Sequence, residues 1–328
     1  MIRRFAVLIV LSVFGTTVDA CNIPVFRYAL ERWRPDPCEV FVFYEGHLTG
    51  DEETILRDAL PDRVSDSTSG SGDDPVAKLV RCNIRTLDSN AQSLWSQVKK
   101  QGEPTLPHVV VRVNLGGARF VNGWQGGLRS LEDHGVFKSP SRHEMSRRLL
   151  SGDSVVWLLM TGKDTDQAAH ARKMLREELP KLAEQVQLPE GIGLPGSELY
   201  SDVPLLVRFS FLEISRDDPK ERFLVELLSE IRPDAVARGE PIAVPIFGRG
   251  RALEVIPVGD LNPSLMADLT LFLSGACSCQ VKDQNPGFDL LFDANWNGEL
   301  FEEGFKPPPA KSGGQNRRPE LLDIPPGR

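Results

Sequence analysis

The sequence predicts an α/β protein made of two consecutive βαβαββα units. Short runs rich in β-branched and aromatic residues alternate with longer amphipathic stretches, which is the pattern that strands and helices give in an α/β fold. In each series a glycine-containing turn separates the last two strand runs: Gly116-Gly117 in the first and Gly248-Arg249-Gly250 in the second. The chain length of 328 residues accommodates two modest domains.

The first unit is expected to begin with a short amphipathic helix. Apolar residues recur at helical spacing over residues 26–33, and two prolines follow directly. We expect the arginines of this segment to face solvent: Arg27, Arg32 and Arg34.

The rest of the first unit follows the same two patterns. β-branched and aromatic runs mark the strands, whereas spaced apolar residues behind a capping residue mark the helices. The expected strands are residues 40–44, 79–84, 108–113 and 119–124, and the expected helices are residues 51–60, 88–99 and 128–132. Residues 61–74 are rich in Ser, Gly and Asp, which predicts a mobile surface loop.

The second unit repeats the order. Its expected strands are residues 154–160, 205–214, 242–247 and 253–258, and its expected helices are residues 165–187, 219–231 and 263–273. Asn262 is the expected cap of the last helix. The prolines and glycines after it predict a disordered tail over residues 301–328. The expected domains are therefore residues 21–145 and 146–300.

The N-terminal segment 1–20 has the organisation of a signal peptide. Arg3 and Arg4 precede an uncharged apolar stretch over residues 5–15, and compact residues occupy the cleavage positions at Val18 and Ala20. This apolar stretch is shorter than the roughly 20 residues that a bilayer-spanning helix needs. We therefore expect residues 1–20 to be removed and the mature chain to be exported to the periplasm or cell envelope.

Cys21 follows the expected cleavage site directly. This placement resembles the lipobox of bacterial lipoproteins, in which the cysteine is acylated, although Asp19 departs from that pattern. The two alternatives are a lipid anchor on Cys21 and ordinary cleavage before it, and membrane association is expected only through such an anchor. The formal net charge of −8 argues against nucleic acid as a partner.

Two prolines, Pro107 and Pro245, are expected at the start of the third core strand of each unit. With the βαβαββα order, they resemble the thioredoxin fold, whose proline at this place is commonly cis. Thioredoxin-like oxidoreductases carry Cys-x-x-Cys between the first core strand and its helix, where residues 45–48 and 161–164 of this sequence contain no cysteine. The resemblance implies two tandem thioredoxin-like units without that dithiol chemistry.

A second resemblance concerns residues 21–33. They start Cys-Asn-Ile-Pro-Val-Phe-Arg-Tyr and resemble the beginning of a group of uncharacterised exported bacterial proteins. That resemblance implies no activity.

The candidate thiol site consists of Cys277 and Cys279, in a loop rich in glycine and turn residues where we expect solvent access. A Cys-x-Cys pair can form a strained disulfide that acts in redox chemistry, or offer two thiolates to Cu(I) or zinc. Two thiolates do not complete a tetrahedral zinc site. The structural alternative is that both are packed or disulfide-bonded elsewhere, with Cys38 or Cys82 as possible partners.

Other motifs are weaker. The histidines show no metal-ligand spacing, and His143-Glu144 lacks the second histidine of a zinc protease motif. Residues 293–299 carry oxygen ligands suited to calcium but lack the glutamate that closes such a loop.

These patterns predict a non-catalytic binding or scaffold protein with a protein partner in the cell envelope and no cofactor. The alternative is a thiol-disulfide oxidoreductase or copper-handling protein that uses Cys277 and Cys279.

Overall fold

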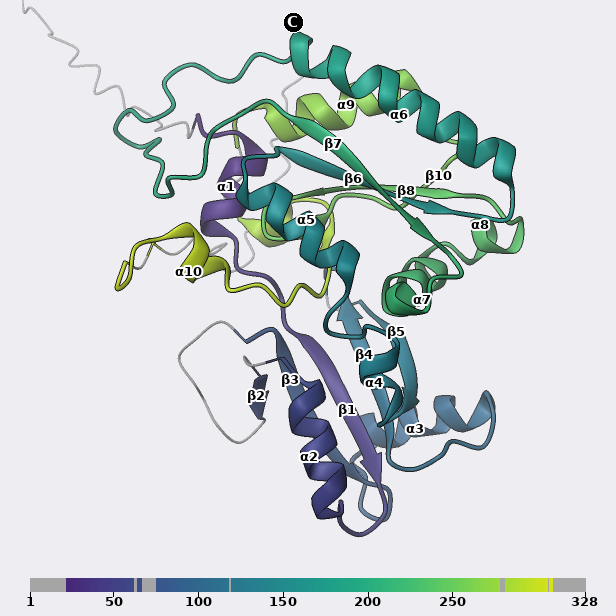
Figure 1. Cartoon of the computed structure of the whole chain (residues 1–328). Helices are drawn as coiled ribbons and strands as arrows, with labels where there is room; N and C mark the ends of the chain where they lie inside the picture. The colour runs from purple at the N-terminus through teal and green to yellow at the C-terminus, as the bar shows by residue number, and fades with distance from the viewer. Residues whose placement is uncertain are drawn as a thin grey trace, which may run out of the picture.

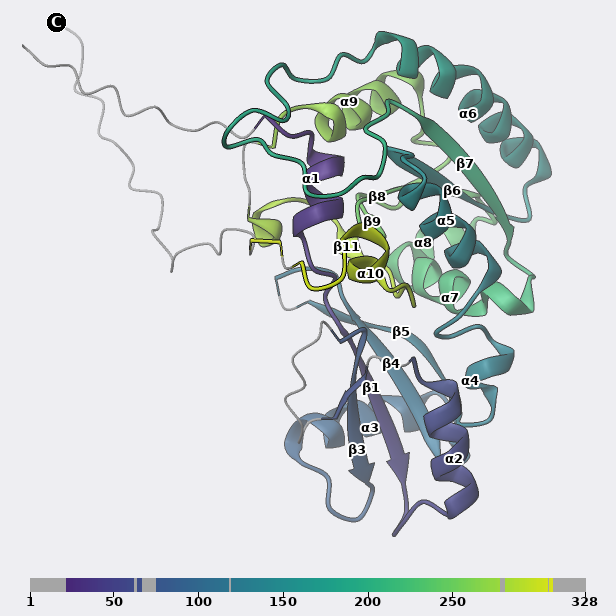
Figure 2. The ribbon, with the colours of Figure 1, turned by 60° about the vertical axis from the view of Figure 1, so that its left-hand side comes forward.

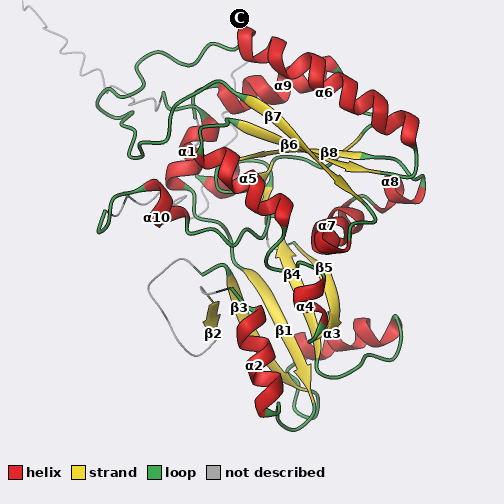
Figure 3. Ribbon diagram, viewed as in Figure 1, coloured by secondary structure: helices red, strands yellow, loops and turns green. Residues whose placement is uncertain are grey.

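Two mixed β-sheets with helices on their faces form the framework of the protein (Figures 1 and 3). The structure is a computed structural model that describes residues 22–61, 64–66, 75–117, 119–277, 281–305 and 307–308. The predicted α/β class is confirmed.

The first sheet has five strands in the order β2-β3-β1-β4-β5. They are β1 (Cys38–Tyr44), β2 (Val64–Asp66), β3 (Ala77–Asn83), β4 (His108–Asn114) and β5 (Phe120–Gly127). β1 runs parallel to β3 and antiparallel to β4, and β4 runs antiparallel to β5. The short β2 lies within the predicted loop 61–74 and pairs in parallel with β3, so a loop throughout this segment is wrong.

Three helices belong to the first unit: α2 (Gly50–Ala59), α3 (Ser89–Lys100) and α4 (Ser130–Asp133). Thr49 begins α2 through a capping box with Glu52, which satisfies two helix-end donors. α3 covers the opposite face of the sheet from α2, where the ring of Trp95 stacks on that of Phe43 with centroids 4.8 Å apart.

The second sheet has the order β11-β9-β8-β6-β7, with β10 also paired to β8. Its strands are β6 (Val155–Thr161), β7 (Phe209–Ser215), β8 (Ile242–Phe247), β9 (Arg251–Ala252), β10 (Ile256–Pro257) and β11 (Phe288–Asp289). β6 runs parallel to β7 and antiparallel to β8, and β8 runs antiparallel to β9. Both sheets therefore arrange their four central strands with the same order and directions.

The remaining helices pack around this second sheet (Figure 2). They are α1 (Val25–Arg32), α5 (Pro140–Leu150), α6 (Thr165–Gln185), α7 (Arg222–Ile231), α8 (Pro233–Ala237), α9 (Pro263–Ser274) and α10 (Trp296–Leu300), with two short 3₁₀ turns, η1 (Pro219–Glu221) and η2 (Lys282–Gln284). Side chains on β6 alternate between faces: Trp157 and Leu159 join the core with α1, α6 and α9, whereas Val156 and Leu158 join the core with α7.

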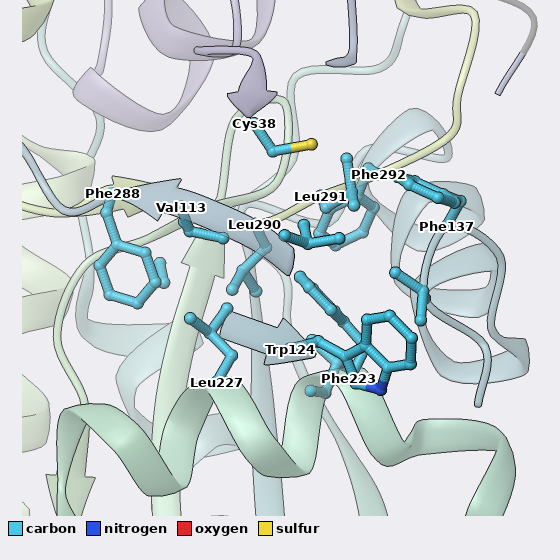
Figure 4. Close-up of a cluster of buried hydrophobic side chains, with 14 of the residues drawn as sticks. Cys38, Val113, Trp124, Phe137, Phe223, Leu227, Phe288, Leu290, Leu291 and Phe292 are labelled. Atoms are coloured by element: carbon cyan, nitrogen blue, oxygen red, sulfur yellow. The ribbon is translucent and has the colours of Figure 1, made fainter. Parts of the chain in front are cut away.

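The two units share one hydrophobic core. α7 follows β7 in the second unit, yet it packs against β5 of the first sheet. Gly123 of β5 permits this approach, because a Cβ there would lie only 3.3 Å from Leu227 Cδ1 and 3.5 Å from Phe223 Cε2. Figure 4 shows Trp124 of β5 beside Phe223 in this cluster. The units are therefore joined by buried apolar surface as well as by the chain.

The predicted domain boundaries need correction. α1, expected in the first unit, packs on the second sheet, and α5 runs continuously through the expected boundary at residues 145 and 146. The predicted disordered tail begins too early, because Phe301 is buried in the shared core and the ring of Phe305 lies 5.8 Å from that of Tyr200. Apart from 301–305 and 307–308, the expected tail lies outside the described residues.

The expectation that Arg27 faces solvent is wrong. Its side chain is buried, pairs with Glu31 at 2.9 Å and donates to the carbonyl oxygens of Ser201 and Val203, each at 2.6 Å. The segment between α6 and β7 lies along α1 and closes over this face. A helical pattern alone does not reveal that a distant loop covers the polar side.

Candidate functional site

The thiols Cys38 and Cys82 are buried on the first sheet, and both are free in the structure. Because they are free, the alternative that either one forms a disulfide with Cys277 or Cys279 is wrong. Burial raises the pKa of Cys38 to about 12 and that of Cys82 to about 11, so both remain protonated and poorly nucleophilic at neutral pH.

Cys277 follows the end of α9 and is buried, with 1% of its surface exposed. Its backbone N–H donates to the carbonyl oxygen of Ile23 at 2.9 Å, and Pro24 forms a β-bridge with Ala276. The expectation of a solvent-accessible thiol at Cys277 is wrong, because the first residues before α1 pair with this segment and cover it. Cys279 lies outside the described residues.

The described part of the chain contains no group of three or more His, Cys, Asp or Glu side chains placed to hold a metal ion. Residues 293–299, whose oxygen ligands suit calcium but lack the closing glutamate, contain α10, whose N-cap is Asn295, with its side chain accepting from Gly298 N. Nor does any helix within the described ranges combine the length and apolar character needed to cross a membrane.

The two loops compared above with the thioredoxin active site serve as helix caps. After β1, the side-chain amide of Asn83 donates to the carbonyl oxygen of Gly46 at 3.1 Å, and Thr49 caps α2. After β6, Asp164 caps α6 by accepting from the backbone N–H groups of Asp166 and Gln167. His47 is exposed in the first loop. These loops are organised by capping.

The two prolines that were expected to start strands differ. Pro107 directly precedes β4, and the Leu106–Pro107 peptide bond is cis. Pro245 is the fourth residue of β8, so its expected place at the strand start is wrong. The carbonyl oxygen of Pro245 accepts a hydrogen bond from Leu253 N, which lies in the break between β9 and β10. In an antiparallel strand the nitrogen and the carbonyl oxygen of one residue point to the same side. The missing N–H therefore falls where strand pairing is interrupted.

A pocket of about 440 Å³ opens where the loop before α5 and the first turns of α5 meet the segment after β11. Phe137 and Phe292 lie in its wall and belong to the shared core (Figure 4). Lys138 and His143 are exposed at its edge, and Lys138 Nζ lies 3.6 Å from Asp293 Oδ2. The pocket therefore combines an apolar wall with a rim that carries both charges.

Arg142 lies in the lining of this pocket with only 2% of its surface exposed. Its guanidinium donates to Ser139 Oγ at 3.1 Å and to the carbonyl oxygens of Val136 at 3.0 Å and Leu291 at 2.5 Å, and also to Gly135 O. Burial lowers its pKa to about 10, which still leaves it charged at neutral pH. No carboxylate of the described residues forms a direct ion pair with it, but the negative charges of Glu221 and Asp293 oppose the lowering of its pKa.

Arg142 therefore supplies positive charge to the pocket while it positions the walls. Its bonds hold the loop before α5 against the segment after β11, which lies far along the chain. A buried cation that no carboxylate contacts directly favours a ligand group of negative charge, and the nearby charges of Glu221 and Asp293 reduce that preference. The apolar wall suits a ligand that also carries an apolar part.

A second polar cluster fastens the same C-terminal segment. Lys282 Nζ lies 2.8 Å from Asp36 Oδ1 and also contacts Asp289, whose other oxygen lies 3.4 Å from Arg251 Nη1. Burial and the neighbouring Asp289 raise the pKa of Asp36, while Lys282 opposes this shift. These contacts join the linker between α1 and β1 to β11, next to the pocket wall.

Sequence reasoning did not identify this pocket. His143 drew attention only as part of an incomplete zinc motif, and Asp293 and Ala294 only as the start of the calcium-like segment 293–299; the structure places all three at the pocket. The two sides of the pocket, at residues 137–146 and 292–294, are far apart in the sequence, so no local spacing could connect them. Comparison of the chain with protein-family models, with curated proteins and with solved structures finds no match.

Proposed function

We propose that this chain is an exported, non-catalytic binding protein of the cell envelope, built from two tandem thioredoxin-like units. The proposed ligand or partner site is the pocket between α5 and residues 292–294. The burial of every described thiol is the observation that carries the proposal: Cys38, Cys82 and Cys277 are each at most 5% exposed.

The thioredoxin-like part of the proposal is supported by strand order. β3-β1-β4-β5 and β7-β6-β8-β9 each consist of a parallel pair followed by two antiparallel additions, as the βαβαββα order requires. On the first sheet, α7 of the second unit packs against β5. Both loops at the position of the thioredoxin active site lack cysteine, so the proposed fold does not imply dithiol chemistry.

The location is supported by the order of charge, apolar residues and small residues over residues 1–20. Cys21 either carries a lipid or becomes an unmodified N-terminus. Intact mass of the mature protein from its native host distinguishes these two products.

Site-directed photo-crosslinking in the native host tests the binding proposal. A photoreactive residue at position 143 is compared with one at position 170, because His143 and His170 are both exposed on helices and only His143 borders the pocket. The expected result is a discrete protein adduct from position 143 that is absent from position 170. Absence of a discrete adduct from position 143 would contradict the proposed site.

The same experiment in a Cys277→Ser and Cys279→Ser variant tests the alternative function. A binding module keeps the adduct in this variant. Loss of the adduct, together with a metal ion or an easily reduced disulfide in the intact mass of the native protein, would favour the thiol or copper function instead.

A further inference from the structure

Exposed apolar side chains lie on two segments that hydrogen-bond to the first described residues. Five large apolar residues are well exposed in the described ranges: Leu194 (61%), Leu206 (37%), Leu271 (59%), Phe272 (40%) and Phe305 (45%). Leu194, Leu271 and Phe272 belong to two segments that both hydrogen-bond to residues 22–25. We call these three residues the apolar corner.

Hydrogen bonds assemble this corner, three of them between backbone groups and one from a backbone N–H to a serine hydroxyl. Gly275 N donates to the carbonyl oxygen of Leu271 at 2.9 Å, and Gly275 O accepts from Val25 N at 3.0 Å. On the other side, Asn22 N donates to Ser197 Oγ at 3.0 Å, and Ser197 N donates to Leu194 O at 2.8 Å. Figure 2 shows the end of α9, the start of α1 and the loop after α6 together at this corner.

α9 presents these side chains because it is apolar on more than one face. Met266, Thr270 and Leu273 are buried against the second sheet, which leaves Leu271 and Phe272 on the outer side. Solvent contact alone does not require two adjacent large apolar residues on the outer side of this helix.

The charged residues nearest in sequence to the corner are acidic. Asp268 lies one turn before Leu271 on α9, and Glu190 and Glu198 flank Leu194; all three are exposed. Carboxylates in these positions repel an anionic surface. The corner therefore suits an uncharged or zwitterionic apolar phase.

From this arrangement we infer that the apolar corner inserts into the interfacial region of a zwitterionic phospholipid bilayer. The inference rests on the proposed export to the envelope. Cys21 directly precedes Asn22 in the sequence, so a lipid on Cys21 would be attached next to this corner. Three side chains bury too little surface for a stable protein interface, which buries about 800 Å² on each partner. Affinity for a bilayer instead increases with each apolar group that inserts.

Vesicle binding tests the inference on the mature chain that starts at residue 21 and carries Cys21→Ser, which removes any acyl group. Its co-sedimentation with phosphatidylcholine vesicles is compared with that of a Leu271→Ser, Phe272→Ser variant. The expected result is at least a tenfold lower ratio of bound to free protein for the variant. A Leu206→Ser variant, which changes an exposed leucine outside the corner, should bind like the parent.

Direct insertion is read from a Phe272→Trp variant, which keeps an apolar side chain. Brominated phosphatidylcholine should quench its fluorescence more than that of the parent chain, and adding anionic lipid at low salt should weaken binding. Equal binding of parent and double variant, or no binding by the parent, would overturn the inference. A parent dimer that the double variant converts to monomer would overturn it too, because a second copy would then cover the corner.

These outcomes are separate from those of the proposed function. The vesicle assay uses purified protein and does not depend on the crosslinked partner, and export is read independently from the intact mass.

Discussion

Removing the carboxylate of Glu31 should destabilise the protein more than removing any surface carboxylate. Glu31 is fully buried and accepts four hydrogen bonds: from Arg27 Nε at 2.9 Å, Arg32 Nη1 at 2.9 Å, Tyr200 N at 3.0 Å and Ser201 N at 3.2 Å. Burial lowers the pKa of Arg27, and the charge of Glu31 opposes that shift.

The expected magnitude follows from these contacts. Breaking a buried ion pair by removing one partner costs about 3–5 kcal/mol, because the other charge stays buried. Glu31→Ala also deprives two backbone N–H groups of their acceptor, which places the cost toward the upper end of that range. At an m value of about 3 kcal/mol/M in urea, the unfolding midpoint should fall by about 1 M or more.

Urea unfolding followed by tryptophan fluorescence measures this loss. Glu177→Ala is the matched control, because its carboxylate is 53% exposed and lies 3.9 Å from Lys173 Nζ. The control should change the free energy of unfolding by no more than about 0.5 kcal/mol. A cost for Glu31→Ala below about 1 kcal/mol would refute the reasoning that the loop before β7 is fastened to α1 through this carboxylate.

Three further predictions concern other parts of the fold. Cys82 should resist alkylation at pH 8 in the folded protein and react within minutes in urea, because burial raises its pKa; rapid labelling in the folded state would contradict this. Gly135→Ala should cost at least about 1 kcal/mol more than Gly117→Ala in urea unfolding, because both glycines have φ of 59° but only the Cβ at 135 would strike the carbonyl oxygen of Lys220; equal costs would be inconsistent with this geometry. Burial lowers the pKa of His108 below 6.5, so the unfolded chain binds the proton more tightly and stability should fall as pH drops below about 6.5; His108→Phe should reduce that fall between pH 7.5 and 5.5, and an unchanged fall would contradict it.

Much of the secondary structure could be predicted, because caps and apolar spacing are local properties. Asn262, expected to cap the last helix, does so by accepting from Leu265 N at 3.0 Å. α5 was missed, and the predicted strand over residues 253–258 contains only the two-residue β10, while β9 ends before it. In these places tertiary packing outweighs local preference.

The candidate site could not be predicted, because its parts meet only in the folded chain. Arg142 has the sequence character of a surface helical arginine, yet the carbonyl oxygens of Val136 and Leu291 hold it beneath the pocket. Cys277 was expected in an accessible loop, and its pairing with Ile23, at the opposite end of the described chain, buries it.

The sequence by itself determined the α/β class, most strand and helix positions and the absence of cysteine from residues 45–48 and 161–164. Only the tertiary structure decided which polar groups are buried, that the two units share one core, and where the pocket and the apolar corner lie. The physical reason is range: hydrogen bonding within a helix and apolar periodicity act over a few residues, whereas burial depends on every segment that packs against a side chain. Arg27 illustrates this, since the segment that buries it, around Ser201 and Val203, follows only after the whole first unit and α6.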